Sequence, residues 1–218
     1  MENIVELLRL PSPTPKPQAI GFDGTTLWIG SRETHRLYAI DPSSWNARDE
    51  GEAPGTPWGL TPVGDFLRVI VGEGAQDDRF IRTFIPGKGF ERSSAIACPD
   101  FTGSHLSYDG DWLYVSQWYN KRIIGLDDTG RIVRDLHAPH QIAGQTYAGG
   151  HFYLLTTDDE EVHQYWLTRL DAKNGDVRSE DLARIDFDAR GLAFDGERFW
   201  TNHREADQVV AFALPDAE

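Results

Sequence analysis

Short runs of apolar residues alternate with turn residues along the whole chain, and the pattern repeats. The clearest copies are AIGFDGTTLWIGSRETHRLYAID from Ala19, HLSYDGDWLYVSQWYNKRIIGLD from His105 and GLAFDGERFWTNHREADQVVAFAL from Gly191. Two more divergent copies begin at Gly59 and Gly144, so equivalent positions are separated by 40, 46, 39 and 47 residues. A period of this length is typical of an architecture that repeats one small structural unit.

Each copy predicts a small antiparallel sheet. Asp-Gly pairs at 23–24, 109–110 and 195–196 separate an apolar run from an aromatic one, and glycine accepts the positive φ of a tight hairpin turn. The runs at 26–29 and 112–115 are β-branched and aromatic, which favours strands. A later turn, for example at 127–130, leads into a polar fourth strand. Five such units without helical periodicity predict an all-β, five-bladed β-propeller with four-stranded antiparallel blades.

The two ends of the chain complement each other. The fifth copy ends at Leu214, after its third strand, and a strand-like segment at 3–10 precedes the first copy. Pairing these segments completes the last sheet and leaves no open edge where the ring closes. The Pro-rich stretch at 11–17 then links the outer edge to the centre. We therefore expect one domain over 1–218, with blades at about 18–57, 58–100, 101–142, 143–187 and 188–214 plus 2–10.

Composition narrows the class of protein. Of 218 residues, 39% are hydrophobic and 11% aromatic, which argues against disorder. No apolar run reaches the roughly 20 residues of a membrane helix. With 35 acidic against 21 basic residues, the net charge of -14 repels nucleic acids and anionic membranes, so neither is an expected partner. The single cysteine, Cys98, cannot form an intrachain disulfide. The first ten residues lack the basic and apolar regions of a signal peptide, so we expect a cytoplasmic protein.

The segments FDGTTLWIGS, YDGDWLYVSQ and FDGERFWTNH resemble the propeller group of gluconolactonase-type lactonases, NHL-repeat proteins and virginiamycin B lyase. The resemblance covers nearly the whole chain and implies the fold, although one fold hosts many functions. For the lactonase branch it implies a channel metal on Glu, Asn and Asp ligands, but Lys16-Pro17-Gln18-Ala19 stands where the first glutamate is expected. For the lyase branch it implies His and Glu with magnesium, and only His105 lies near such a position.

The five-unit ring is also similar to plant-type glutaminyl cyclases. Gln18 at the entry of the first strand and the stretch WGLT at 58–61 carry this likeness. The glutamate of that family falls near Ile29 in this sequence, and an aliphatic side chain cannot transfer protons. The second resemblance therefore implies the fold without the cyclase activity.

The loops that enter the inner strands and those that join the second and third strands open on one face of a propeller, where a pocket is expected. Substrate-binding candidates on this face are Gln18, Arg32, Trp58, Trp118, Tyr119, Gln145 and Arg190. Arg32 and Arg190 can hold a carboxylate or phosphate through paired hydrogen bonds. The aromatic side chains offer flat faces for a ring or sugar, although packing between blades is an equal alternative for Trp58 and Trp118. For Arg190, an ion pair with Asp188 is the more common outcome.

The catalytic candidates are His105, His203 and Glu73. An unperturbed histidine titrates near neutrality and can exchange protons. His105 is the strongest candidate because it lies on an inner strand, with a hydrogen-bonded structural histidine as the alternative. For His203 the alternative is a solvated loop residue. These side chains with Glu73 or Glu205 can also hold a divalent metal, Ca²⁺ or Mg²⁺, in the channel, so the cofactor stays open.

These features predict a propeller that handles a small molecule at the channel mouth. One hypothesis is a hydrolase or lyase for a small anionic or ring-containing substrate, with His105 as general acid or base and Arg190 orienting the substrate. The other is a non-catalytic module that binds a ligand or a partner protein on the same face. The sequence identifies neither the substrate nor the reaction.

Overall fold

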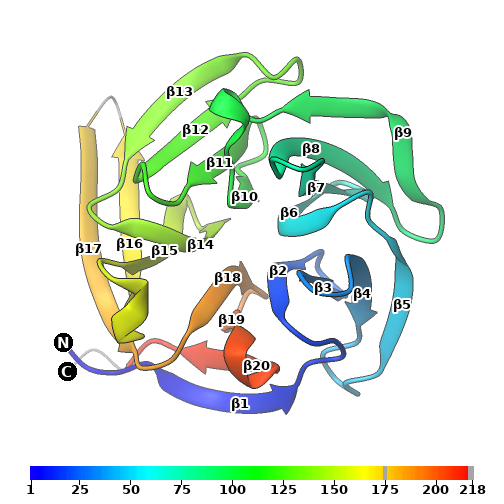
Figure 1. Cartoon of the computed structure of the whole chain (residues 1–218). Helices are drawn as coiled ribbons and strands as arrows, with labels where there is room; N and C mark the ends of the chain where they lie inside the picture. The colour runs from blue at the N-terminus through cyan, green and yellow to red at the C-terminus, as the bar shows by residue number, and fades with distance from the viewer. Residues whose placement is uncertain (174–175, 216–218) are drawn as a thin grey trace.

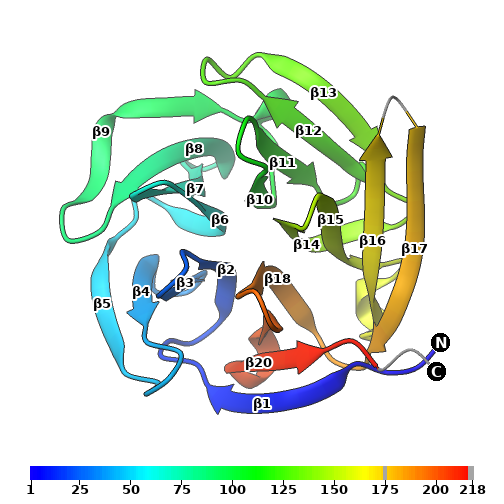
Figure 2. The same cartoon turned by 180° about the vertical axis from the view of Figure 1, so that it is seen from behind.

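The structure is a computed structural model that describes residues 1–173 and 176–215. Five four-stranded antiparallel sheets surround one axis as the blades of a propeller (Figures 1 and 2). The predicted fold class, an all-β five-bladed β-propeller, is confirmed. Over the described ranges, no helix is both long and apolar enough to cross a membrane.

Each blade runs from an inner strand at the axis to an outer strand at the rim. The first blade comprises β2 (Pro17–Phe22), β3 (Leu27–Ser31), β4 (Arg36–Ile40) and β5 (Ala47–Glu52). The second comprises β6 (Thr56–Val63), β7 (Phe66–Glu73), β8 (Asp78–Ile85) and β9 (Gly89–Ala97). The third comprises β10 (His105–Tyr108), β11 (Leu113–Gln117), β12 (Arg122–Leu126) and β13 (Ile132–His137), after the short helix η1 (Pro99–Phe101).

The fourth and fifth blades carry the other two short helices. The fourth comprises β14 (Gln141–Ala148), β15 (His151–Thr157), η2 (Glu160–Val162), β16 (Tyr165–Lys173) and β17 (Asp176–Ile185). The fifth comprises β18 (Ala189–Phe194), β19 (Phe199–His203), η3 (Arg204–Ala206), β20 (Gln208–Ala213) and, as its outer strand, β1 (Val5–Pro11).

The N-terminal strand closes the ring, as the sequence predicts. β1 pairs antiparallel with β20, from Val5 opposite Ala213 to Pro11 opposite Gln208 (Figure 1). The residues before β1 also reach the fourth blade, where Arg184 N donates to the carbonyl of Glu2 at 2.9 Å. The start of the chain thus joins the fourth blade to the fifth and covers the edge of β20.

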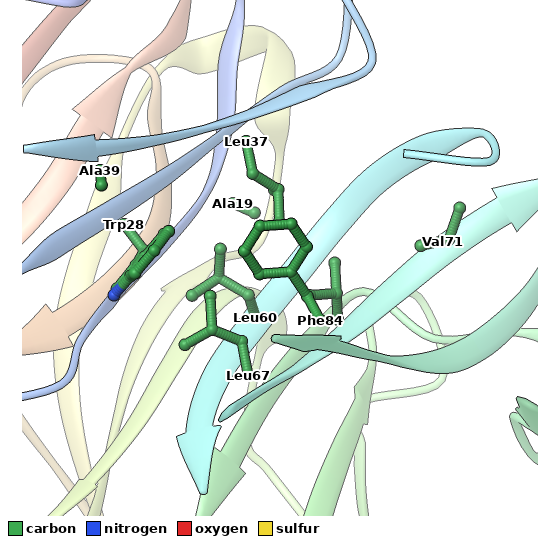
Figure 3. Close-up of a cluster of buried hydrophobic side chains, with 9 residues drawn as sticks. Ala19, Trp28, Leu37, Ala39, Leu60, Leu67, Val71 and Phe84 are labelled. Atoms are coloured by element: carbon green, nitrogen blue, oxygen red, sulfur yellow. The ribbon is translucent and has the colours of Figure 1, made fainter. Parts of the chain in front are cut away.

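The hydrophobic core lies between the blades and consists of five clusters, one at each interface between neighbours. Figure 3 shows the cluster between the first and second blades, where Trp28 packs edge-on against Phe84 at 5.8 Å between ring centroids. Because every blade buries both faces, the burial holds the five sheets in a fixed arrangement and makes the axial face a rigid frame for loops.

The Asp-Gly turns of three blades share one hydrogen-bond arrangement. In each, the Oδ1 atom of the aspartate accepts hydrogen bonds from two backbone N–H groups of the turn. The Oδ2 atom accepts one from the aromatic residue five positions later: Trp28 to Asp23 at 2.7 Å, Tyr114 to Asp109 at 2.9 Å, and Trp200 to Asp195 at 2.7 Å. The turn aspartate therefore ties the hairpin to the buried aromatic side chain of the second strand.

We expect Asp195→Ala to lower the free energy of unfolding by about 2 kcal/mol, because it leaves the buried Trp200 N–H and two turn N–H groups without their acceptor. Urea unfolding followed by tryptophan fluorescence measures the change. The exposed Asp128→Ala, in another turn, is the matched control and should stay within about 0.5 kcal/mol of the unchanged protein. Equal stability of the two variants would contradict the role assigned to Asp195.

Small residues let the inner strands approach one another at the axis. A Cβ on Gly144 would lie 2.7 Å from the backbone carbonyl carbon of Gly191, and one on Gly59 would lie 2.6 Å from His105 Cα. The equivalent position of the first blade holds Ala19. Only the third blade places a large side chain there, His105, and that side chain is buried with 3% exposure.

Candidate functional site

A cavity of about 770 Å³ opens on the face formed by the loops that enter the inner strands and join the second and third strands. All five blades contribute side chains to it. Its lining consists of Gln18, Arg32, Trp58, Arg79, Thr102, Gly103, Ser104, Gln117, Trp118, Tyr119, Asn120, Glu161, His163, Asp188, Arg190, Arg204 and Glu205. The volume lies in the range of small-molecule sites, and its place is the face that the repeat predicts.

Six of the seven substrate-binding candidates line this cavity: Gln18, Arg32, Trp58, Trp118, Tyr119 and Arg190. The seventh, Gln145, is buried in β14 and is not part of the lining. Its Nε2 donates to Ser107 Oγ at 3.2 Å and to the carbonyl of Tyr114 at 2.7 Å. These bonds join the third and fourth blades, so the structure places Gln145 between blades.

The three catalytic candidates do not meet at the cavity. Glu73 at the end of β7 forms two hydrogen bonds of 2.8 Å with the guanidinium of Arg82. His203 lies against the Phe187 ring at 4.9 Å, with Nδ1 3.0 Å from Arg9 Nη1 of β1. Neither lines the cavity, because each is held by a partner on a strand or loop away from it.

His105 lies close to two arginines of the cavity but is not among its lining residues. Burial, and then the charges of Arg190 and Arg79, lower the pKa of His105 to about 3. The imidazole is therefore neutral at physiological pH, and its Nε2 has no hydrogen-bond partner in the described part of the protein. His105 lies on the inner strand as expected, but its side chain is buried at a repeat position where the other blades have alanine or glycine.

Arginine dominates the chemistry of the cavity. Arg32, Arg79, Arg190 and Arg204 line it together with three carboxylates, Asp188, Glu161 and Glu205. The arginines of the lining outnumber its carboxylates by one, whereas the whole chain has a net charge of -14. A positively charged cavity in a negatively charged protein attracts anions.

Trp58 supports two of these arginines. The guanidinium carbons of Arg32 and Arg79 lie 4.9 Å and 3.9 Å from the centre of its ring. Asp77 accepts hydrogen bonds from Trp58 Nε1 at 3.2 Å and from Arg79 Nη2 at 2.8 Å. Trp58 therefore positions two guanidinium groups by cation–π contact.

Arg32 and Arg79 differ in their remaining contacts. Arg79 donates to the carbonyls of Asp77 and Gly103 as well as to the Asp77 carboxylate. Burial lowers its pKa, and among the neighbouring charges Arg32 lowers it too. The guanidinium of Arg32, in contrast, has no hydrogen bond or ion pair within the described residues and is exposed to the cavity. Its fork of donors is open to a ligand.

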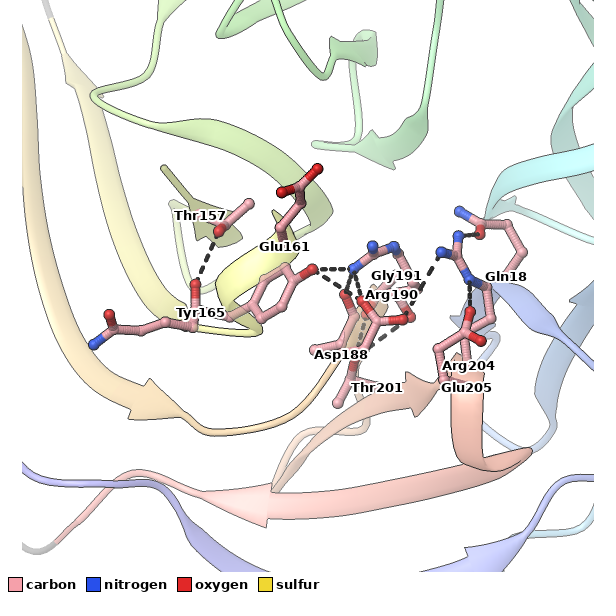
Figure 4. Close-up of polar contacts among 12 residues, drawn as sticks. Gln18, Thr157, Glu161, Tyr165, Asp188, Arg190, Gly191, Thr201, Arg204 and Glu205 are labelled. Atoms are coloured by element: carbon pink, nitrogen blue, oxygen red, sulfur yellow. Dashed lines mark hydrogen bonds and ion pairs between the residues drawn. The ribbon is translucent and has the colours of Figure 1, made fainter. Parts of the chain in front are cut away.

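Arg190 is fixed from several sides (Figure 4). Its Nη1 donates to Asp188 Oδ1 at 2.6 Å, to the carbonyl of Ala189 at 2.8 Å and to the hydroxyl of Tyr165. The ring of Trp118 lies 4.8 Å from its guanidinium carbon. The ion pair with Asp188 that the sequence suggests is present, and the buried guanidinium cannot turn without breaking these contacts.

Arg204 joins this pair to the first blade (Figure 4). Its Nη1 donates to Gln18 Oε1 at 3.0 Å and its Nε to Glu205 Oε1 at 3.2 Å, while its Nη2 lies 3.8 Å from Asp188 Oδ2. Burial and then the charge of Arg190 lower the pKa of Arg204, and Arg32 also contributes to the lowering. The four arginines line one cavity, and the charge of Arg32 lowers the pKa of both Arg79 and Arg204.

The lining does not suit a divalent cation. No group of three or more His, Cys, Asp or Glu side chains in the described portion of the chain is arranged to hold a metal ion. The carboxylates of the cavity face four guanidinium groups, which repel Ca²⁺ and Mg²⁺. The residues present therefore do not fit the channel metal that the lactonase resemblance implies.

No family model matches the chain, and no curated protein matches it by sequence. Among solved structures it is similar to glutaminyl cyclase from Myxococcus xanthus, with 14% identity, a TM-score of 0.72 and 100% of both chains covered. It is also similar to the PQQ-bound aldose sugar dehydrogenase from Streptomyces coelicolor, with 12% identity, a TM-score of 0.58 and 98% of both chains covered.

Virginiamycin B lyase from Staphylococcus aureus is similar over 95% of this chain and 99% of its own, with 13% identity and a TM-score of 0.51. The two resemblances stated from sequence, to this lyase group and to glutaminyl cyclases, are thus confirmed for the fold. Sequence identities this low support a similarity of fold and nothing about activity. The chain is a five-bladed β-propeller whose structural neighbours include a dehydrogenase, a cyclase and lyases.

Proposed function

We propose that this propeller binds a small organic anion in its axial cavity. The observation that supports the proposal is the convergence of four arginines on one cavity of a strongly acidic protein. Bringing like charges together and burying them costs free energy, which an anion recovers through charge-assisted hydrogen bonds. Arg79, Arg190 and Arg204 each have a carboxylate partner, so the open charge of Arg32 is the part of this arrangement that a structural role does not need.

Arg32 is the group that we propose contacts the ligand first. Its guanidinium is open to the cavity and is held in place by the Trp58 ring rather than by an acid. A planar guanidinium matches a carboxylate through two parallel N–H donors. Arg190, which is 3% exposed at its side chain, and Arg204 then supply positive charge from the floor.

A hydrolase or lyase that acts on this anion is the finer proposal, and it needs a proton donor or acceptor at the cavity. His105 no longer suits that role, because it is buried and neutral. Glu161 and His163, in the loop between β15 and β16, are exposed titratable side chains of the lining. If the protein is a hydrolase or lyase, these two side chains act as the general acid or base, the role that the sequence suggested for His105.

We expect Arg32→Ala to weaken anion binding about tenfold or more, the cost of losing one charged hydrogen-bonding partner. Calorimetric titration with acetate, phenylacetate and inorganic phosphate at low and physiological salt measures it, and affinity should fall as salt rises. Arg131→Ala is the matched control, since Arg131 is exposed and pairs with Asp127 outside the cavity lining. The proposal fails if the unchanged protein binds none of the probes, or if the two variants bind equally.

A further inference from the structure

One oxygen of the cavity floor has no donor. The Asp188 side chain is 5% exposed and belongs to the cavity lining. Its Oδ1 accepts hydrogen bonds from Tyr165 at 2.9 Å and from Arg190. Its Oδ2 accepts none from the residues that the structure describes. A buried carboxylate oxygen normally has a donor, so Oδ2 is an acceptor for a group that the chain itself does not supply.

The unfilled acceptor lies beside Arg204, another arginine of the cavity lining. Arg204 Nη2 is 3.8 Å from Asp188 Oδ2, too far for a hydrogen bond but close enough for attraction. Arg32 and Arg204 line the same cavity, and the charge of Arg32 lowers the pKa of Arg204. Arg204 lies beside Asp188 (Figure 4), so a carboxylate bound by Arg204 on the cavity side has its adjacent substituent near Asp188.

The charge of the lining limits what that substituent can be. Three arginines of the lining each have a carboxylate partner: Arg79 in Asp77, Arg190 in Asp188 and Arg204 in Glu205. Among the described lining residues this leaves the charge of Arg32 unpaired, which a ligand of charge -1 neutralises. A zwitterion leaves that charge unbalanced, and the second charge of a phosphate monoester has no further unpaired arginine in the described lining. A neutral donor beside a single carboxylate satisfies both the charge and the acceptor, and a hydroxyl group is such a donor.

We propose that the ligand is a small 2-hydroxycarboxylate, with its carboxylate on Arg32 and Arg204 and its hydroxyl donating to Asp188 Oδ2. This rests on the proposed function and names its substrate class. Asp188 is then the residue that determines specificity. A site built to bond a hydroxyl discriminates strongly against the analogue that lacks it, because the buried acceptor is left unfilled.

Matched ligand pairs test this on the unchanged protein by calorimetric titration: lactate against propionate, and mandelate against phenylacetate. We expect each hydroxy acid to bind about tenfold or more tightly than its partner. Equal affinities overturn the hydroxyl assignment while anion binding stands. Tighter binding of alanine or phenylglycine than of the hydroxy acids also overturns it, in favour of an ammonium donor. Failure of all these acids to bind overturns the proposed function as well.

Asp188→Asn tests the residue itself, because it replaces one carboxylate oxygen by an amide nitrogen, which does not accept a hydrogen bond, and removes the negative charge. We expect the ratio of mandelate to phenylacetate affinity to fall to about one, with phenylacetate still bound. Asp128→Asn, at an exposed turn outside the lining, should keep the full ratio. If Asp188→Asn folds and retains the ratio, the assignment of Asp188 is wrong. If it does not fold, the ligand pairs on the unchanged protein decide alone.

Discussion

Replacing Gly144 by alanine is expected to destabilise the protein by about 3 kcal/mol, at the upper end of the cost of overpacking. The added Cβ would lie 2.7 Å from the carbonyl carbon of Gly191 and 3.0 Å from its Cα. These are backbone atoms of the neighbouring inner strand β18, so no side-chain rotation relieves the contact. Relief requires β14 and β18 to separate, which disturbs the packing of the fourth blade against the fifth.

Chemical denaturation at neutral pH measures the loss. Gly64→Asn is the matched control, because Gly64 has nothing within 4 Å of an added Cβ and a φ of +59°, which asparagine tolerates. The control should change the free energy of unfolding by less than about 1 kcal/mol. If Gly144→Ala is as stable as the control, the inner strands do not pack as closely at the axis as the structure has them.

The fold could be predicted because each repeat carries the chemistry of its own turns. An Asp-Gly pair followed by an aromatic strand specifies the hairpin, and the structure shows why the pattern recurs: Asp23 and Asp195 each bind the indole N–H five residues later. Closure was predictable for a topological reason. The fifth unit lacks its fourth strand, and the strand at 3–10 belongs to no unit, so the second supplies what the first lacks.

The face of the site was predictable, but the roles of its side chains were only partly so. Repeat position determines which loops open on the axis, and Gln18, Arg32 and Tyr119 line the cavity as predicted. Repeat position does not say which charges pair. Glu73 lies next to a loop of the correct face, yet Arg82 of the adjacent strand binds it.

Arg79 is one of the lining residues that sequence reasoning missed, with Thr102, Gly103, Gln117 and His163. Arg79 lies just beyond the loop at 74–77, on β8, and alternation along a strand gives no signal that its side chain turns toward the cavity. The hydrogen bonds to Asp77 and to the carbonyl of Gly103 determine that direction. Such contacts depend on the approach of the second and third blades, which a linear pattern does not contain.

His105→Gln is expected to remove much of the acid sensitivity of the fold. In the folded protein, burial and then Arg190 and Arg79 hold the pKa of His105 at about 3, against an ordinary value near 6.5 in the unfolded chain. Between these values the unfolded state binds the extra proton, so stability is complete above pH 6.5 and falls as the pH falls toward 3. The loss amounts to about 2 kcal/mol between pH 7 and pH 5.

The test compares the slope of stability against pH, since Gln also changes packing at every pH. Urea unfolding at pH 7, 6 and 5 should show the unchanged protein losing about 2 kcal/mol more than His105→Gln over this range. His137→Gln, at an exposed position on β13, should keep the slope of the unchanged protein. Parallel curves for all three proteins would mean that His105 titrates normally and reaches solvent. A steep slope lost only in His105→Gln places the neutral imidazole close to Arg190 and Arg79, whose charges oppose its protonation.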